Sequence, residues 1–97
     1  MYMPKLDKKV RLVTSITQIL EGYMWDGTDR TFDGIGNLLG NEYDLSINSS
    51  NQLEIINSRG YTKRVDIGNY VATNEDGDMV LLTGARVLHH FKVIERI

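Results

Sequence analysis

The sequence contains no cysteine, one proline and two histidines, and these shortages exclude several classes of protein. Without cysteine the chain has no disulfide framework, no thiol nucleophile and no thiolate metal site. The two histidines, His89 and His90, are adjacent, and neighbouring residues on a helix point in different directions. They do not supply the ligands of a typical zinc site. We therefore expect neither a bound metal nor a cofactor.

The sequence also lacks a strong charge of one sign and any long apolar run. Eleven basic and thirteen acidic side chains give a net charge of −2, which argues against a protein that covers DNA through general attraction to phosphates. The apolar runs span only a few residues, and the N-terminus lacks the hydrophobic segment of a signal peptide. We expect a cytosolic (cytoplasmic) protein that binds neither DNA nor a membrane.

Length and composition indicate a single small domain. The chain has 97 residues, of which 41% are hydrophobic and 25% charged, so it can form one core. It has no internal repeat and no low-complexity tract. We expect one domain over residues 1–97, in which residues 1–9 form a basic arm or a first edge strand.

The first half of the chain carries both strand and helix signals. Dense β-branched residues from Val10 to Trp25 predict one or two strands that end before the turn Asp26-Gly27. Helix is the competing interpretation of this range, because four of its apolar residues also fall at helical spacing. A short helix is predicted over Phe32 to Leu39, although Gly34 and Gly36 weaken it.

The second half alternates apolar and polar residues, which is typical of antiparallel strands with one buried face. Predicted strands lie at 43–47, 53–55, 61–65, 70–73 and 79–82. Thr83 then caps a second short helix, and a closing strand follows through Val93, Ile94 and Ile97. The predicted fold class is α+β, a mostly antiparallel meander with two short helices.

Several segments resemble catalytic or ligand-binding loops but fail on spacing. Gly34–Gly40 is one residue too long for a dinucleotide fingerprint and lies in no strand-helix-strand unit. The acidic loops Asp26–Asp33 and Asn74–Asp78 miss the calcium-loop register. No serine lies in a nucleophile elbow. A pair of carboxylates for acid–base catalysis stays open, because a sequence does not give distances. With no catalytic motif, we expect a binding protein rather than an enzyme.

Aromatic and cationic side chains gather around two predicted turns. Bases stack on Tyr or Trp, and phosphates pair with Arg or Lys, so such clusters favour a nucleotide site. The competing interpretation is structural, since aromatics at strand ends often pack in the core and Lys or Arg protects strand edges. For the lone tryptophan the core interpretation is favoured. The candidate ligand-binding residues are Tyr23, Trp25, Arg30, Arg59, Tyr61, Lys63 and Arg64.

Five short segments follow one another in a characteristic order. They are Glu21–Gly27, Leu53–Ile55, Ile67–Val71, Asn74–Gly77 and Phe91–Ile94. In this order they resemble a large group of small bacteriophage proteins, which share an acidic–aromatic stretch ending in Gly, a central strand, a Gly-Asp turn, a Gly-containing hairpin and a terminal Phe. This chain departs from the pattern at Gly68-Asn69. It also has Thr14–Gln18 in place of a Lys-rich strand with proline, which leaves the orientation of the N-terminal strand open.

The resemblance implies an anti-defence protein of the phage. Proteins of this size class are similar to oligomeric anti-CBASS sponges, which bind cyclic nucleotide alarm signals and withhold them from host effectors. It implies a cytosolic homo-oligomer, which we expect to be a tetramer, that sequesters a cyclic dinucleotide such as cyclic GMP-AMP without turnover. The alternative is an inhibitor or host-takeover protein that binds a host protein directly. A nuclease or phosphodiesterase acting on the same signals is disfavoured, because no ligand set for a catalytic metal is evident.

Overall fold

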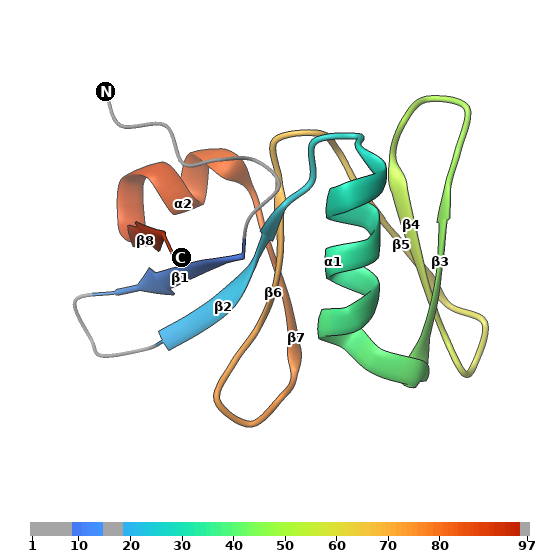
Figure 1. Ribbon diagram of the computed structural model, residues 1–97, viewed down its shortest axis with the longest axis horizontal. Coiled ribbons are helices and arrows are strands. Elements are labelled where there is room, and N and C mark those ends of the chain that lie inside the picture. The colour runs from blue at the N-terminus through green and yellow to red at the C-terminus, as the bar shows by residue number, and fades with distance from the viewer. Residues whose placement is uncertain (1–8, 15–18, 96–97) are drawn as a thin grey trace.

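A computed structural model describes residues 9–14 and 19–95 of the chain (Figure 1). Within this part, antiparallel strands dominate and two α-helices are present, which confirms the α+β class. The predicted basic arm, apart from Lys9, and Ile97 of the predicted closing strand lie outside the described residues. The elements are β1 (Val10–Val13), β2 (Ile19–Met24), α1 (Asp29–Leu39), a 3₁₀ turn (Gly40–Glu42), β3 (Tyr43–Ile47), β4 (Leu53–Asn57), β5 (Thr62–Val65), β6 (Tyr70–Thr73), β7 (Met79–Leu82), α2 (Gly84–His90) and β8 (Lys92–Glu95).

The strands divide between two antiparallel sheets. Strands β3, β4 and β5 form a three-stranded sheet in chain order, which is the predicted meander. The other sheet has the order β7-β6-β2-β1-β8, so the first and last described strands are neighbours. The β1–β8 register places Leu12 opposite Val93. The competing helix interpretation of Val10 to Trp25 is wrong for the described residues, which form β1 and β2.

Three of the hairpin connections use the same asparagine turn. Asn48, Asn57 and Asn74 each accept hydrogen bonds, through Oδ1, from the backbone N–H groups two and four residues later, at 2.9–3.1 Å. The residue three positions after each asparagine has positive φ, and it is Asn51, Gly60 or Gly77. Positive φ suits glycine and, to a lesser degree, asparagine. Asparagine side chains therefore set the register of β3–β4, β4–β5 and β6–β7.

Helix α1 begins at Asp29, three residues before the predicted start. Thr28 is its N-cap: the Thr28 hydroxyl accepts from the Thr31 N–H at 3.3 Å and donates to Asp26 Oδ1 at 2.7 Å. The helix continues through Gly34, and the absence of a side chain there makes room for a neighbouring residue. A Cβ atom at Gly34 would lie 2.6 Å from the Tyr23 ring, so the glycine lets β2 approach the helix closely.

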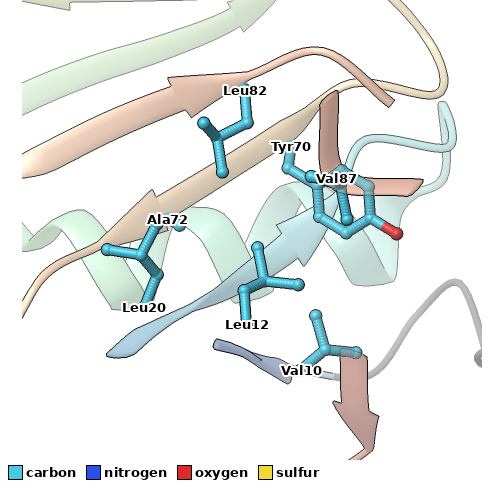
Figure 2. Close-up of a cluster of buried hydrophobic side chains, with 7 residues drawn as sticks. All are labelled: Val10, Leu12, Leu20, Tyr70, Ala72, Leu82 and Val87. Carbon is cyan, nitrogen blue, oxygen red and sulfur yellow. The ribbon is translucent and has the colours of Figure 1, made fainter. Parts of the chain in front are cut away.

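The five-stranded sheet buries apolar side chains on both faces. On one face α2 covers a cluster made of Val10, Leu12, Leu20, Tyr70, Ala72, Leu82 and Val87 (Figure 2). Figure 2 shows the Tyr70 ring beside Val87, with its oxygen directed away from the other side chains. Thr83 is the N-cap of α2, as predicted, and accepts from the Arg86 N–H at 3.1 Å.

On the other face of the five-stranded sheet, a second cluster joins the two sheets through α1. Figure 1 shows α1 between β2 and β6 on one side and the three-stranded sheet on the other. The fully or nearly fully buried members are Trp25, Ile35, Leu53, Ile55, Val65 and Val71. Apart from Trp25, which follows β2, these residues come from both sheets and from α1, so the second cluster holds the two sheets together.

Trp25 lies at the centre of this junction and is completely buried. Its indole Nε1 donates to the backbone oxygen of Asn51, in the β3–β4 turn, at 2.8 Å. Its backbone N–H donates to Asn69 O and its backbone oxygen accepts from the Gly68 N–H, both at 2.8 Å. One residue thus connects the end of β2 to two turns of the chain.

We predict that Trp25→Ala lowers the free energy of unfolding by about 3–5 kcal/mol, because it empties the centre of the second cluster. Trp25→Phe keeps most of the ring but removes the donor to Asn51, so we expect a smaller loss of about 1–3 kcal/mol. Urea unfolding followed by circular dichroism measures both values. A wild-type midpoint for Trp25→Ala would contradict the core role of this residue.

A second prediction concerns Tyr70, where burial raises the pKa of the phenol above its ordinary value. The folded protein then holds the phenol proton more tightly than the unfolded chain does. The contribution of this phenol to the free energy of unfolding is fully present below the unfolded pKa of about 10. It is lost as the pH rises toward the higher folded pKa. In unfolding measurements from neutral to strongly alkaline pH, Tyr70→Phe should lose stability less steeply than wild type above about pH 10. If the unfolding free energies of wild type and Tyr70→Phe fell equally with pH, the raised pKa of Tyr70 would be contradicted.

Candidate functional site

The candidate residues of the first turn do not form an open site, although Tyr23 packs against the cluster that contains Trp25. Trp25 is fully buried, so its ring offers no face to a ligand. Tyr23 is half-buried, with its ring against Gly34 of α1. Arg30 is exposed, but it lies in the first turn of α1 rather than in the turn that the sequence suggested. The prediction that these three line one site does not fit this geometry.

The two candidate groups also lie at opposite ends of the three-stranded sheet. Trp25 is tied to the β3–β4 turn through Asn51. Arg59 lies in the β4–β5 turn, at the other end of β4. Figure 1 shows these turns at opposite ends of the sheet. A single small ligand therefore does not contact both groups within one chain.

Arg64 faces away from the other candidates on β5. Side chains alternate along a strand, so Arg64 shares one face with Thr62, and Lys63 shares the opposite face with Val65, which is buried. The Arg64 Nε lies 2.9 Å from Glu54 Oε2, opposite it on β4. This ion pair occupies the outer face of the sheet, away from the core.

Tyr61 and Lys63 do come together, in a pocket between the three-stranded sheet and the start of β7. The pocket has a volume of about 180 Å³, and its walls are Tyr43, Ile55, Asn57, Tyr61, Lys63 and Met79. Strand register explains the grouping, because Tyr43 lies opposite Asn57 and Ile55 opposite Lys63. The inner face of the sheet thus ends in two phenol rings, one amide and one ammonium group.

Lys63 carries a positive charge that no acidic side chain of residues 9–14 and 19–95 offsets. Among the described residues, its ammonium group forms no ion pair within 4.0 Å. Its strand neighbour is the buried Ile55, and Met79 also lines the pocket. The exposed ammonium group lies with phenol and amide groups in the pocket, a set of groups that can pair with an anion. Tyr61, whose side chain is 69% exposed, offers a ring face beside it.

Asn57 both shapes the pocket and lines it. Its Oδ1 accepts from the N–H groups of Arg59 and Tyr61 at 2.9 and 3.1 Å, which holds the β4–β5 turn in place. With the oxygen used in this way, the side-chain amide N–H groups remain as donors. The same hydrogen bonds fix where Tyr61 leaves the turn and where the exposed Arg59 lies.

The size of the pocket limits what it can hold. Ligand sites commonly have volumes of roughly 300–1,000 Å³, and this pocket, at about 180 Å³, is smaller. It accommodates one ring or one anionic group rather than a whole dinucleotide. The rest of a larger ligand would lie on the protein surface or against another protein chain.

Two other hollows contain fewer of the candidate residues. One, of about 190 Å³, has Arg64 at its rim, and its wall also includes Tyr70 and Thr83. A wider and more open hollow of about 560 Å³ lies where α2 ends, lined by Val13, Thr14, His89, His90, Phe91 and Lys92. No candidate from the sequence lies in it. Three of its six lining residues are exposed and three are half-buried.

Within the described ranges, no group of three or more His, Asp or Glu side chains is arranged to hold a metal ion. In the same ranges, no helix has both the length and the apolar character needed to cross a membrane.

No protein-family model, no curated protein and no solved structure matches this chain.

Sequence reasoning missed four residues of the pocket: Tyr43, Ile55, Asn57 and Met79. Tyr43 and Met79 begin strands that are far apart in the chain, and their approach depends on how the sheets pack. Asn57 carried a local signal, because it begins one of the three asparagine turns. The repeated spacing of an asparagine and, three residues later, a glycine or a second asparagine was visible in the sequence.

We predict that Lys63→Met leaves the free energy of unfolding within about 0.5 kcal/mol of wild type, because Lys63 is exposed and forms no ion pair with another described residue. Arg64→Met is the matched control, since it breaks the exposed ion pair with Glu54 and should cost at most about 1 kcal/mol. Thermal and urea unfolding measure both. A large loss for Lys63→Met would mean that Lys63 has a structural role.

Proposed function

We propose that this protein binds and sequesters a cyclic dinucleotide of bacterial immune signalling, such as cyclic GMP-AMP, and does not turn it over. The observation that carries the proposal is the position of Lys63. It is a cation without an acidic neighbour among the described residues, in a pocket that also has two tyrosine rings. A planar base attached to a phosphate matches this combination of groups.

Each pocket residue has a role in this proposal. Tyr61 stacks on a base, because its ring is the most exposed aromatic face in the pocket. Lys63 pairs with the phosphate next to that base. Arg59, exposed in the adjoining turn, reaches the second phosphate. Tyr23, Trp25, Arg30 and Arg64 have no direct role within this pocket.

The small volume of the pocket favours a site shared between copies of the chain. A cyclic dinucleotide has two bases and two phosphates, and one pocket of about 180 Å³ receives only one base. Two pockets brought together by a two-fold axis would receive both halves of a symmetric or nearly symmetric ligand. We therefore keep the homo-oligomer, expected to be a tetramer, as part of the proposal. The phage origin and the host cytosol remain implications of the resemblance alone.

The second candidate function is direct binding to a host protein. It is favoured by β5, which is an edge of its sheet and has three exposed residues, Thr62, Lys63 and Arg64. Such a strand can add to a sheet of another protein. The positive charges on β5 argue for an acidic partner segment in that case.

The experiment that tests nucleotide binding is a thermal shift with a panel of cyclic di- and trinucleotides. Tyr61→Ala should weaken binding of the active ligand by about 1–3 kcal/mol, and Lys63→Met or Arg59→Ala by about 1.5–3 kcal/mol. Arg64→Met should bind like wild type, because Arg64 faces the other side of β5.

Recovery of the ligand then separates the functions. Intact nucleotide released by denaturing the complex supports sequestration, whereas cleaved nucleotide means that the protein is an enzyme. If no member of the panel shifts the melting temperature, nucleotide sequestration is wrong and the protein-binding function is favoured. Equal affinities of all four variants would place the nucleotide outside this pocket.

A further inference from the structure

Strand β3 is an edge strand whose one charged residue is the exposed Asp44. It lies at the end of the order β3-β4-β5, and no other strand of the described residues pairs with its outer side. Edge strands commonly carry Lys, Arg or Pro, which discourage pairing with another chain. Strand β5 has such charges, whereas β3, with the sequence Tyr-Asp-Leu-Ser-Ile, has no basic residue and no proline. Its last residue, Ile47, is 39% exposed.

The hairpin geometry shows which backbone groups of β3 face outward. In the β3–β4 hairpin the N–H of Asn48 donates to Gln52 O at 3.1 Å. Hydrogen-bonded pairs alternate along an antiparallel ladder, so Ser46 and Asp44 also direct their backbone groups to β4. The N–H and C=O groups of Tyr43, Leu45 and Ile47 therefore point to the free edge.

We propose that β3 pairs with β3 of a second copy of this chain, antiparallel and about a two-fold axis at Leu45. In this register Tyr43 lies opposite Ile47 of the second copy, and Leu45 lies opposite Leu45. All three outward-facing residues of each strand then exchange backbone hydrogen bonds. The pair of an aromatic and a β-branched residue is a favourable cross-strand contact.

The side chains of the outer face also suit this register. Asp44 lies opposite Ser46 of the second copy, so a carboxylate faces the hydroxyl group that within its own chain makes a long hydrogen bond of 3.5 Å to Glu54 Oε1. A register centred on Asp44 would place two carboxylates opposite each other, and one centred on Ser46 would use only two of the three outward-facing residues. The chemistry of β3 therefore selects the register at Leu45.

The other edges of the two sheets are less suited to self-pairing. A two-fold axis on β5 at Lys63 or Arg64 would place that cation opposite itself. Strand β7 lies close to β5, since Met79 and Lys63 line one pocket and Leu81 and Arg64 another. Strand β8 begins with the exposed Lys92, a charge that protects an edge.

Pairing at β3 also affects the pocket. Tyr43 is one of its walls, and in the proposed register Ile47 of the second copy lies next to Tyr43. The assembly in the proposed function would rest on this edge. The test below needs no nucleotide, so failure of the dimer and failure of nucleotide binding are observed separately.

The most direct test of the register introduces cysteines into this chain, which has none of its own. In each copy, Asp44 and Ser46 direct their backbone groups to their own β4. Asp44 of one copy and Ser46 of the other therefore form a non-hydrogen-bonded pair, with Cα atoms about 4.5 Å apart. A disulfide fits that separation. The double variant Asp44→Cys/Ser46→Cys should become a disulfide-linked dimer on mild oxidation, as seen on a non-reducing gel.

The single variants are the controls for register. Asp44→Cys alone, or Ser46→Cys alone, would have to bridge a diagonal of roughly 7–8 Å, which is too long for a disulfide. We expect little cross-linking from either of them or from Thr62→Cys on β5. Cross-linking of the singles as fast as the double variant would overturn the register.

Sedimentation equilibrium over a concentration series tests the dimer without cysteines. Wild type should associate as dimers or as larger even-numbered assemblies. The dissociation constant of Ile47→Lys should be about tenfold higher or more, because the variant places a cation on the edge. Ile67→Lys, at a residue that is 55% exposed and lies outside the strands, should associate like wild type. A wild type that stays monomeric throughout, or equal association of both variants, would overturn the proposal.

Discussion

The indole of Trp25 is the contact on which the arrangement of the two sheets depends. It is the largest fully buried side chain, and its hydrogen bond to Asn51 reaches from the end of β2 to the β3–β4 turn. The backbone of the same residue holds the turn before β6. The three-stranded sheet, α1 and the five-stranded sheet therefore meet around one ring. The position of β5 relative to β7, and with it the pocket, follows from this junction.

Local sequence patterns predicted most of the elements, because most of the signals are local. Alternation identified the strands from β3 to β7, and Thr83 identified the start of α2. The start of α1 was missed by three residues, since the cap at Thr28 lies in a polar stretch before the apolar spacing that indicated the helix. The division into two sheets was also missed. It depends on pairing of β1 with β8 and of β2 with β6, between segments that no local pattern connects.

The candidate site was predictable only in part, for a similar reason. Residue types pointed to Tyr61 and Lys63, which do line one pocket. The same reasoning grouped them with Trp25 and Arg64, although one is in the core and the other forms an ion pair on the opposite face of β5. Chemistry alone does not tell on which face of a strand a side chain lies. In this fold that face decides which charges are available to a ligand.

The pairing of β1 with β8 has a consequence for how the chain folds. The hairpins between β3 and β7 join residues close in sequence, so little chain entropy is lost when each one closes. Pairing of β1 with β8 closes a loop of nearly the whole chain, which costs more chain entropy than closing any one hairpin. During synthesis β8 is the last described strand to leave the ribosome. Until then one side of β1 has no partner strand, so the nascent protein contains an incomplete sheet that a chaperone or another chain can bind.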